Sequence, residues 1–340
     1  MEKKVTIREV AKEAGVAIST VSNALNGSDL VKDETRQKIL ETAKRLGYVP
    51  NMSGKILKGG RSRQLCFLTS TVTGEYFVRL MDAMNHACID YGYGLNIAIT
   101  RDRELVMKHL LGRQFDGFFV FEGEYLQESE IDTLKREQIP VVMFDRKYES
   151  ERISSVVFDS CKASREMTNY LIGLGHKRFC FVDSTQYNYD SVERKRGFMQ
   201  ALAKVGIGRD AITVIHGYFD EHTTFSAVLA LETGNRLANL PMPTAYVCGN
   251  DISAIGAIKA LRKLNYSVPE DVSVAGFDDI ELAQYFQPAL TTVRNPIEQQ
   301  GRTAVEMMID LLDRDGAGRA EVLKGLIVAR NSTWICGAGR

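Results

Sequence analysis

The stretch "TIREVAKEAGVAISTVSNALNG", from Thr6 to Gly27, decides how the first part of the chain folds. Thr6 and the glutamate three residues later have the spacing of a capping box. Apolar residues follow at helical spacing as far as Gly15, which is placed to end the helix. A second helix is expected to start near Ile18 or Ser19, directly after this turn. Two short helices joined by a tight glycine turn predict a helix-turn-helix.

A third helix is expected from about Asp33 to Leu46, with Asp33 supplying its cap and Gly47 stopping it. The three helices would pack their apolar faces together into one small core. The residues expected in this core are Ile7, Val10, Ala11, Ala14, Val21, Ala24, Leu25, Ile39, Leu40, Ala43 and Leu46.

The second helix carries no charged side chain, although it lies in the most basic part of the chain. Base edges in the major groove suit small and amide side chains, whereas the DNA phosphates would repel carboxylates there. An ordinary buried helix pair is the alternative, but so many neighbouring polar residues make it the weaker one. The side chains expected to contact DNA from this helix are Ala17, Ile18, Ser19, Thr20, Ser22 and Asn23.

The 340 residues of the chain are too many for one ordinary core, and they predict two or three domains. The net charge is zero but unevenly spread. Residues 1–63 hold 13 Lys and Arg against 7 Asp and Glu, a net charge of +6, and the remainder carries −6. Because the basic segment has helical apolar periodicity, we interpret it as a polyanion-binding module rather than a tail that only aids solubility.

The cysteines and histidines show no metal-binding or catalytic spacing. The six cysteines form no CxxC pair, and most lie in apolar runs, as small core residues of a reducing compartment do. The N-terminus lacks the apolar segment of a signal peptide, and no apolar run approaches the roughly 20 residues of a membrane span. We therefore expect a cytoplasmic protein with no metal, no cofactor and no membrane contact.

From Leu65 onwards, short apolar runs alternate with helical segments. The runs are "LCFLT", "GLNIAI", "DGFFVF", "PVVMFD", "SSVVFD", "RFCFVD", "AITVIHG", "TAYVCG" and "VSVAGFD". This alternation predicts an α/β core of two doubly wound parallel-sheet subdomains, in blocks near residues 64–158 and 159–290. Ligands in such folds bind at the carboxyl ends of the strands, here in a cleft between two lobes.

These segments together resemble the lactose/galactose-repressor (LacI/GalR) family. The head sequence, continued by "VKDETRQKILETAKRLGYVPN", is similar to the DNA-binding head of that family. Further runs extend the similarity over nearly the whole chain: "LIGLGHKRFCFV", "RKRGFMQAL", "GNDISAIGAIKALRKLNYSVPEDVSVAGFDDI" and "LTTVRNPIEQQGRTAVEMMIDLL". The resemblance implies a homodimeric repressor that binds a pseudo-palindromic DNA operator. It also implies a periplasmic-binding-protein-like core with a small-molecule effector, a sugar or sugar derivative, between its lobes.

The resemblance also implies a division of the chain into three parts. A helix-turn-helix domain would span residues 1–49, a hinge helix or linker residues 50–63, and an effector-binding and dimerisation core residues 64–340. Within the core, the N-lobe would hold residues 64–158 and 291–328, and the C-lobe residues 159–290 and 329–340. The helices after Glu75 and Asn250 would supply much of the dimer face.

Asn23 departs from the family, which usually has arginine at that position. Arginine pairs with guanine and asparagine with adenine, so we expect a half-site in which this guanine is replaced, adenine being the base that asparagine favours. Lys32 is a second departure, because the family tends to place a serine cap there. The other DNA contacts that the resemblance implies are Thr6, Asn26, Tyr48, Asn51, Gly54, Lys55, Leu57 and Lys58.

The segment "PNMSGKILKGGRSRQ", from Pro50 to Gln64, resembles the family's hinge helix, which enters the minor groove in pairs. Leu57 matches the leucine that wedges open a base step and kinks the duplex. Gly54 stands where the family commonly has alanine, and glycine costs about 1 kcal/mol of helix propensity. We expect the segment to fold only on DNA or when two copies are held together; a plain flexible linker is the alternative.

The residues expected to hold the effector follow the ends of strands. Carboxylates, amides and a guanidinium can bind vicinal hydroxyls, and aromatic rings can stack on a sugar face. Each also has a structural alternative: capping a helix, holding the lobes together, or packing in the core. The effector contacts that the resemblance implies are Thr71, Tyr76, Phe77, Phe121, Asp145, Arg194, Phe219, Asn250 and Asp278.

The first lobe departs from the family beside this site. Where the family often has D-x-x-N-P-F-F, this chain has "TVTGEYF", from Thr71 to Phe77, so that Glu75 replaces a proline. Glu122 and Glu124 add acidic groups close by. A basic effector or an amino sugar is weakly suggested, and the effector of a relative cannot simply be carried over.

Enzymatic activity has little support in the sequence. Asp278 and Asp279 are adjacent carboxylates, but at a strand end they would point in different directions, and no acid or base partner is evident. We therefore expect a regulator and not an enzyme. Two alternatives stay open: a pure small-molecule binding protein, and a regulator of the same fold that is controlled by a protein partner.

Overall fold

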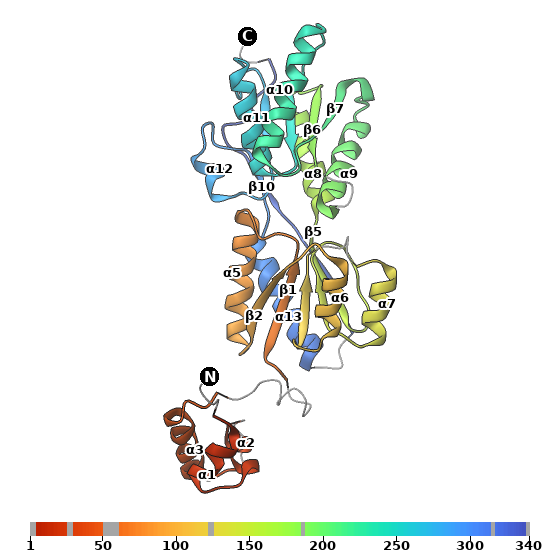
Figure 1. The fold of residues 1–340 in the computed structure, drawn as a ribbon. Coiled ribbons are helices and arrows are strands. Elements are labelled where there is room, and N and C mark those ends of the chain that lie inside the picture. The colour runs from red at the N-terminus through yellow and green to blue at the C-terminus, as the bar shows by residue number, and fades with distance from the viewer. Residues whose placement is uncertain are drawn as a thin grey trace. The chain divides into compact units, whose positions relative to one another are not determined.

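The structure is a computed structural model that describes residues 5–25, 30–49, 61–121, 126–184, 188–313 and 317–337. The chain divides into two compact units, Met1–Ser62 and Arg63–Arg340. Each unit is described by itself, and Figure 1 labels the helices and strands of both.

The first unit contains the three helices that the sequence predicts: α1 (Ile7–Ala14), α2 (Ile18–Leu25) and α3 (Asp33–Arg45). The Glu9 carboxylate accepts a hydrogen bond from the Thr6 main-chain N–H at 2.7 Å, which confirms the capping box. Gly15 follows α1 in the left-handed conformation, with a φ of 70°, and so ends the helix as expected. The buried core of the unit is formed by Val10, Ala11, Ala14, Val21, Ala24, Val31, Ile39 and Ala43.

Two details of the predicted head are wrong. Leu40 has 43% of its surface exposed, because Ile39 and Ala43, four residues apart, occupy the inner face of α3. Asp33 does not cap α3 but is its first residue, and the cap position is Lys32, which makes no side-chain capping hydrogen bond. The Asp33 carboxylate lies 3.7 Å from Arg36 one turn later.

The second unit contains a six-stranded parallel sheet that, with its helices, we call the N-lobe. Its strand order is β11-β5-β4-β3-β1-β2. The strands are β1 (Gln64–Thr69), β2 (Gly94–Ile99), β3 (Gly117–Val120), β4 (Val141–Met143), β5 (Ile153–Phe158) and β11 (Ala320–Leu323). The helices are α5 (Glu75–Asp90), α6 (Arg103–Leu111), α7 (Glu128–Arg136) and α13 (Ile297–Asp313).

Successive residues of each N-lobe strand face opposite layers, because side chains alternate along a strand. On β1, Leu65 and Phe67 pack against α5 and α13, whereas Cys66 and Leu68 pack against α6 and α7. Figure 1 shows these two helical layers on either side of the sheet. Both faces are covered, which is why the strands read as continuous apolar runs.

A four-stranded parallel sheet, in the order β7-β6-β8-β9, forms with its helices what we call the C-lobe. Helices α8 and α9 cover one face, and α10 and α11 cover the other. The strands are β6 (Phe179–Asp183), β7 (Ile212–His216), β8 (Ala245–Cys248) and β9 (Ser273–Ala275). The helices are α8 (Ser160–Gly173), α9 (Tyr189–Lys204), the short η2 (Arg209–Ala211), α10 (Glu221–Leu237), α11 (Asp251–Lys263) and α12 (Glu281–Tyr285). Two doubly wound parallel sheets are therefore present, as the strand–helix alternation predicts.

The chain passes repeatedly between the two lobes. Strands β10 (Thr292–Arg294) and β12 (Leu326–Val328) pair with each other in antiparallel fashion, and α13 and β11 between them belong to the N-lobe. Beyond β12 the chain returns to the C-lobe, where the Ser332 carbonyl accepts a hydrogen bond from the Val274 N–H at 2.8 Å. With the link from β5 to α8, this makes three connections between the lobes.

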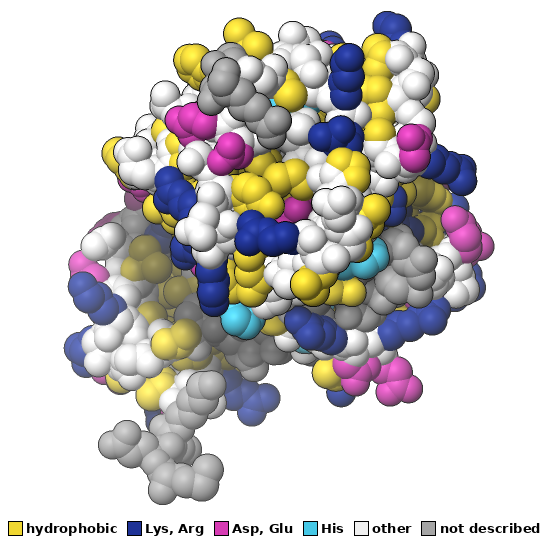
Figure 2. Space-filling view, turned by 90° about the horizontal axis from the view of Figure 1, so that it is seen from above, with side chains coloured by type: hydrophobic (Ala, Val, Ile, Leu, Met, Phe, Trp, Pro, Cys, Tyr) yellow, Lys and Arg dark blue, Asp and Glu magenta, His cyan; other side chains and the backbone are white. Residues whose placement is uncertain are grey.

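None of the helices in the described parts of the chain is long and apolar enough to cross a membrane. Seen from above, the end of the C-lobe carries Lys and Arg side chains scattered among acidic and hydrophobic ones (Figure 2). A single sign of charge is therefore not concentrated on that face.

Candidate effector cleft and DNA-facing helix

A cavity of about 490 Å3 lies between the two lobes of the second unit. Its N-lobe wall comes from the loop after β1, the start of α5 and the residue after β3. Its C-lobe wall comes from the N-terminal ends of α9, α10 and α11 and from the chain after β9. The lining residues are Thr71, Thr73, Gly74, Glu75, Tyr76, Phe77, Phe121, Asn188, Asp190, Arg194, Tyr218, Phe219, Asp220, Asn250, Asp251, Ile252, Asp278 and Ile280.

The C-lobe wall is polar because helices α9, α10 and α11 each follow a parallel strand and begin at the carboxyl edge of the sheet. Asn188, Asp220 and Asn250 are the N-caps of α9, α10 and α11, and each accepts a main-chain hydrogen bond from the third residue after it, at 2.7–2.9 Å. Strand edge and helix caps together make a polar wall.

Eight of the nine residues predicted to contact the effector line this one cavity. They are Thr71, Tyr76, Phe77, Phe121, Arg194, Phe219, Asn250 and Asp278. Asp145 is not among the lining residues: its Oδ2 lies 3.3 Å from the Nε of its own neighbour Arg146, which also donates to the Leu126 carbonyl. The placement of Asp145 therefore gives no support to an effector contact.

Arg194 and Asp278 form the buried charged pair of the cavity. Their side chains are 5% and 10% exposed, and Nη2 of Arg194 lies 3.6 Å from Oδ1 of Asp278. The guanidinium also donates to the Gly249 carbonyl and lies 4.7 Å from the centre of the Phe277 ring. Burial raises the pKa of Asp278, the Arg194 charge opposes this rise, and the charge of Asp190 adds to it.

An aromatic cluster forms part of the N-lobe wall. The Phe77 and Phe121 rings are 4.9 Å apart, and Tyr76 lies 5.3 Å and 5.6 Å from them. The Tyr76 hydroxyl donates to the Gln300 side chain at 3.0 Å, which fixes the ring. Burial and the negative charges of Asp190 and Asp278 all raise the pKa of Tyr76, so the hydroxyl stays protonated at neutral pH.

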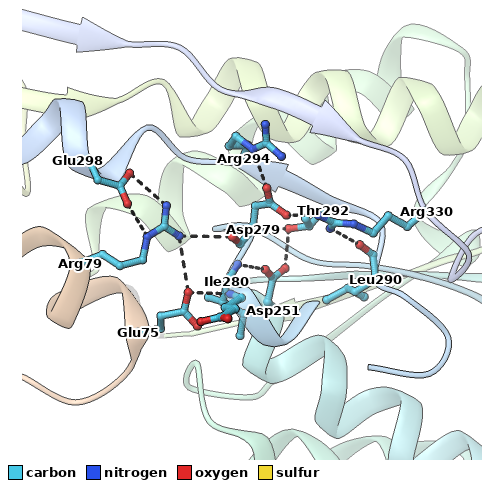
Figure 3. Close-up of polar contacts among 11 residues, drawn as sticks. Glu75, Arg79, Asp251, Asp279, Ile280, Leu290, Thr292, Arg294, Glu298 and Arg330 are labelled. Carbon is cyan, nitrogen blue, oxygen red and sulfur yellow. Dashed lines mark hydrogen bonds and ion pairs between the residues drawn. The ribbon is translucent and has the colours of Figure 1, made fainter. Parts of the chain in front are cut away.

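Polar contacts tie the two lobes together at one rim of the cavity (Figure 3). Arg79 of α5 makes two hydrogen bonds to the Glu298 carboxylate, at 2.8 and 3.1 Å, and a third to the main-chain carbonyl of Asp279 at 3.3 Å. Glu75, one turn before Arg79, accepts a hydrogen bond from the Glu281 N–H at 2.7 Å. The last two of these contacts join the N-lobe to the C-lobe.

Asp278 and Asp279 point in different directions, as expected for neighbours at a strand end. Both have a positive φ, of 104° and 53°. Whereas Asp278 faces Arg194, Asp279 accepts hydrogen bonds from Arg294 and Arg330, both at 2.6 Å (Figure 3). Burial opposes the ionisation of Asp279, but the two guanidinium groups outweigh it and lower the pKa. Asp279 is thus committed to the interlobe connections, so Asp278 and Asp279 do not act as a carboxylate pair.

The described parts of the chain contain no group of three or more His, Cys, Asp or Glu residues that could hold a metal ion. The cysteines of β1, β6 and β8 are buried in the two cores, as the sequence predicts for small core residues.

In the first unit, α2 presents a small and polar surface. Ala17, Ile18 and Ser19 are exposed, whereas Thr20, Ser22 and Asn23 are half-buried. Ile18, with 45% exposed, is the large apolar side chain of this surface. Thr6 is occupied with the capping box at the start of α1, and Tyr48 packs against the small core. Among the predicted DNA contacts, Asn26, Asn51, Gly54, Lys55, Leu57 and Lys58 lie outside the described residues, and so do Glu122 and Glu124.

Sequence reasoning missed several residues of the cavity. Asn188 caps α9, Asp190 lies one turn before Arg194 in that helix, and Asp220 directly follows Phe219. The signal that could have found Asn188 and Asp220 is their capping position after a strand, since such caps lie at the ligand-binding edge. Asp190 follows the cap of α9, and its place in the cavity depends on the fold rather than on a local pattern.

Two regions of the chain match known protein families. Residues 6–51 match the lacI family of bacterial regulatory proteins, and residues 168–333 match a periplasmic binding protein-like domain. The chain is also 30% identical, over 331 residues, to a protein of Bacillus subtilis (strain 168) named as the probable HTH-type transcriptional repressor ExuR. This similarity covers 94% of the present chain and 95% of that protein.

Solved structures share the fold. The Lac repressor dimer bound to its operator and the anti-inducer ONPF has a TM-score of 0.84 at 22% identity, over 98% of the present chain and 100% of that chain. The complex of the transcriptional regulator CelR with cellobiose has a TM-score of 0.70 at 26% identity, over 97% and 100% of the two chains. These proteins are transcription regulators and not enzymes.

Proposed function

The chain belongs to the lacI family of bacterial regulatory proteins and is a DNA-binding transcriptional repressor; we propose that it acts as a homodimer whose hold on an operator is set by a small polyol, such as a sugar, in the cleft. The observation that carries this proposal is the cavity between the lobes. Eight side chains selected from the sequence for ligand chemistry meet around it. Its volume of about 490 Å3 lies within the usual range for small-ligand sites.

The helix α2 is the element proposed to enter the major groove. Its surface combines the exposed apolar Ile18 with small and polar side chains such as Ser19, which suit base edges, and the basic residues around it attract phosphate without specifying sequence. Two copies of the chain would place two such helices on two half-sites, in agreement with a pseudo-palindromic operator. The Lac repressor, which shares the fold, was solved as a dimer on its operator.

The proposed switch is linkage between the cleft and the DNA-binding head. An effector that binds one arrangement of the two lobes more tightly shifts the protein toward that arrangement. A change in the arrangement of the two lobes must bend the three connections between them, because each connection is attached to both lobes. The cellobiose in the related CelR complex supports a carbohydrate as the class of effector.

The experiment that tests this function has two stages. The operator is first selected from random DNA with the full chain, and its affinity is then measured with and without each member of a sugar panel. Thermal melting of the same protein reports binding directly, since a ligand at a hundredfold excess over its dissociation constant stabilises by about 2.7 kcal/mol. We expect one sugar to raise the melting temperature and to change operator affinity by about 5- to 150-fold.

Two matched variants locate the effect. Asp278→Asn should abolish the response, because Asp278 lines the cavity, whereas Asp145→Asn should preserve it, because Asp145 does not. A repressor that binds its operator but responds to no sugar would contradict control by a polyol and would point to a protein partner instead. Failure to select any operator would contradict the DNA-binding function itself.

A further inference from the structure

The cavity between the lobes carries more negative than positive charge. Among the described residues that line it, Arg194 is the only cationic side chain. Five carboxylates line the same space: Glu75, Asp190, Asp220, Asp251 and Asp278. Whether this imbalance selects a ligand depends on which of the carboxylates are already satisfied by the protein.

Three of the five carboxylates are occupied. Asp251 accepts hydrogen bonds from the Thr292 hydroxyl at 2.5 Å and from the Ile280 N–H at 3.0 Å. Asp220 accepts two hydrogen bonds from Thr223, both at 2.7 Å, as the cap of α10. Glu75 belongs to the rim contacts with Glu281 and Arg79. The charge of Glu75 is therefore balanced by Arg79, and the oxygens of Asp251 and Asp220 are engaged by hydrogen bonds from the protein.

The two remaining carboxylates, Asp190 and Asp278, share a single cation. Arg194 faces Asp278 at 3.6 Å and donates to the Ser160 hydroxyl at 3.4 Å. That hydroxyl donates in turn to Asp190 at 2.6 Å. Within the described residues Asp190 makes no ion pair, so the group of three charged side chains keeps one net negative charge.

This charge acts inside the cavity. The charge of Asp190 reaches both Asp278 and the Tyr76 hydroxyl, where it disfavours a second negative charge. Asp190 is half-buried, and the Ser160 hydroxyl that donates to it is neutral, so an ammonium group beside it can make short, charge-assisted hydrogen bonds. The nearby cluster of Tyr76, Phe77 and Phe121 offers aromatic faces, which also attract cations.

We propose that the effector is an amine-bearing polyol, an amino sugar, whose ammonium group lies between Asp190 and Asp278 while its hydroxyls and ring face the other polar groups and the aromatic cluster. This inference rests on the proposed function of the cleft and narrows it to one chemical class. An anionic sugar, such as a uronate or a sugar phosphate, meets repulsion from Asp190, because the single guanidinium is already committed to Gly249 and Asp278.

The test compares derivatives of the same sugar that carry a neutral, a cationic or an anionic group. Glucose, galactose and mannose are each titrated into the full-length protein by calorimetry as the parent sugar, the 2-amino sugar, the N-acetylated amino sugar and the uronate. A pH of about 6.5 keeps the amine protonated, since α-amino groups titrate near 7.7–8.0. We expect one amino sugar to bind at least about tenfold more tightly than its parent, its N-acetyl form and its uronate, a difference of about 1.4 kcal/mol.

Two variants with the same change of charge show whether Asp190 causes the preference for the amine. Asp190→Asn should reduce the preference for the amine to about twofold or less, because it removes the unbalanced charge and keeps an acceptor for Ser160. Asp220→Asn is the matched control. It lines the same cavity, and asparagine caps a helix as well as aspartate does, so the amine preference should stay. Unchanged melting of both variants in the absence of sugar shows that each folds.

The outcomes separate this inference from the proposed function. If a neutral sugar or a uronate binds best and changes operator affinity, the repressor is sugar-controlled and the amine proposal is overturned. Equal preference for the amine in Asp190→Asn and in the unmodified protein overturns it as well. If no member of the series binds or alters operator affinity, the polyol-controlled function and the amine proposal are both overturned.

Discussion

Glu75 of the N-lobe accepts a hydrogen bond from the main-chain N–H of Glu281 in the C-lobe at 2.7 Å, although 206 residues separate them in the chain. Glu75 also pairs with Arg79, which donates to the Asp279 carbonyl across the same rim. The protein itself thus ties the lobes together at one side of the cleft. An effector in the cleft therefore binds between lobes that these rim contacts already join.

Removing the Glu75 carboxylate should loosen the rim. Glu75→Ala is expected to lower the free energy of unfolding by about 1 kcal/mol, since a hydrogen bond to a charged group contributes about 1.5–3 kcal/mol and the side chain is partly exposed. Urea denaturation, followed by the intrinsic fluorescence of the second unit, measures this change in the free energy of unfolding. Glu75→Gln is the control and should lose less, because its amide oxygen can still accept from Glu281. Equal stability of Glu75→Ala and the unmodified protein would show that the contact contributes nothing.

Gly197 of α9 allows close packing against α8, and a side chain should not fit there. A Cβ atom at this position would lie 2.0 Å from the Cys161 carbonyl oxygen. Gly197→Ala is therefore expected to destabilise the protein by about 1–3 kcal/mol or more, through overpacking, and to displace Arg194 on the same helix. Thermal melting and effector affinity should both fall.

Gly234 of α10 provides the matched control for that substitution. A Cβ atom there has nothing within 4 Å, and the residue is in the helix with an ordinary φ. Gly234→Ala should raise the free energy of unfolding by about 0.5–1 kcal/mol, because alanine loses less backbone entropy in a helix. If both substitutions destabilise the protein, the loss in Gly197→Ala cannot be assigned to the close contact with the Cys161 carbonyl.

Arg194 is expected to be essential for stability as well as for binding. Arg194→Met leaves the Asp278 carboxylate buried without its cation, which typically costs about 3–5 kcal/mol. Adding Asp278→Asn to the same chain removes the uncompensated charge and should restore part of the lost melting temperature. If the double variant is less stable than Arg194→Met alone, the two side chains are not coupled in this way.

Acid should weaken the interlobe connections through Asp279. Its pKa in the folded protein lies below the ordinary value of about 3.9, because the hydrogen bonds from Arg294 and Arg330 outweigh the effect of burial. The carboxylate therefore stabilises the fold at all pH values above that ordinary pKa, and this contribution is lost as the pH falls through the lower, folded-state pKa. Melting measured from neutral pH downward should show a steeper acid loss in the unmodified protein than in Asp279→Asn. Parallel curves would contradict the assignment.

Asn23 should set the base preference at one position of each half-site. Asn23→Arg is expected to shift selection from random DNA toward guanine at that position, with a discrimination of about 1–3 kcal/mol. Positions read by the unchanged residues of α2 serve as the internal control and should keep their preferences. An identical selected sequence for both proteins would show that residue 23 does not read a base.

The nine apolar runs of the sequence all form the strands expected of them. The inner strands are buried on both faces and so need apolar residues at most positions, whereas the edge strands β2 and β7 are only partly buried. The remaining strands, β10, β11 and β12, have three or four residues each and lie at the connections and in the late N-lobe segment. Runs that short carry no readable period. Their pairing is decided by tertiary contacts that a local pattern does not contain.

The candidate site shows the same division between local and tertiary information. Residues at strand ends, such as Asn250 after β8 and Asp278 after β9, could be named from the sequence because the fold gathers all carboxyl strand ends at one edge. Asp145 also follows a strand, but its side chain turns to Arg146 beside it. Strand position therefore predicts the neighbourhood of a residue, whereas side-chain direction depends on local partners. Asp190 does not lie at a strand end, yet it lines the cavity because it is in the first turn of α9.

Because α13 and β11 return to the N-lobe late in the chain, the N-lobe cannot complete its fold on the ribosome until these elements have been synthesised. The four strands of the C-lobe sheet have all been made by residue 275, but the N-lobe face that bears Leu65 and Phe67 gains its cover of α13 only when residues 297–313 emerge. At about 5–20 residues per second, the apolar sheet begun at β1 waits for more than ten seconds for that helix. During synthesis the N-lobe sheet begins first, yet this face of it is covered only after the C-lobe sheet has been made, and the open face is where a chaperone, or a second nascent copy, has access to the chain.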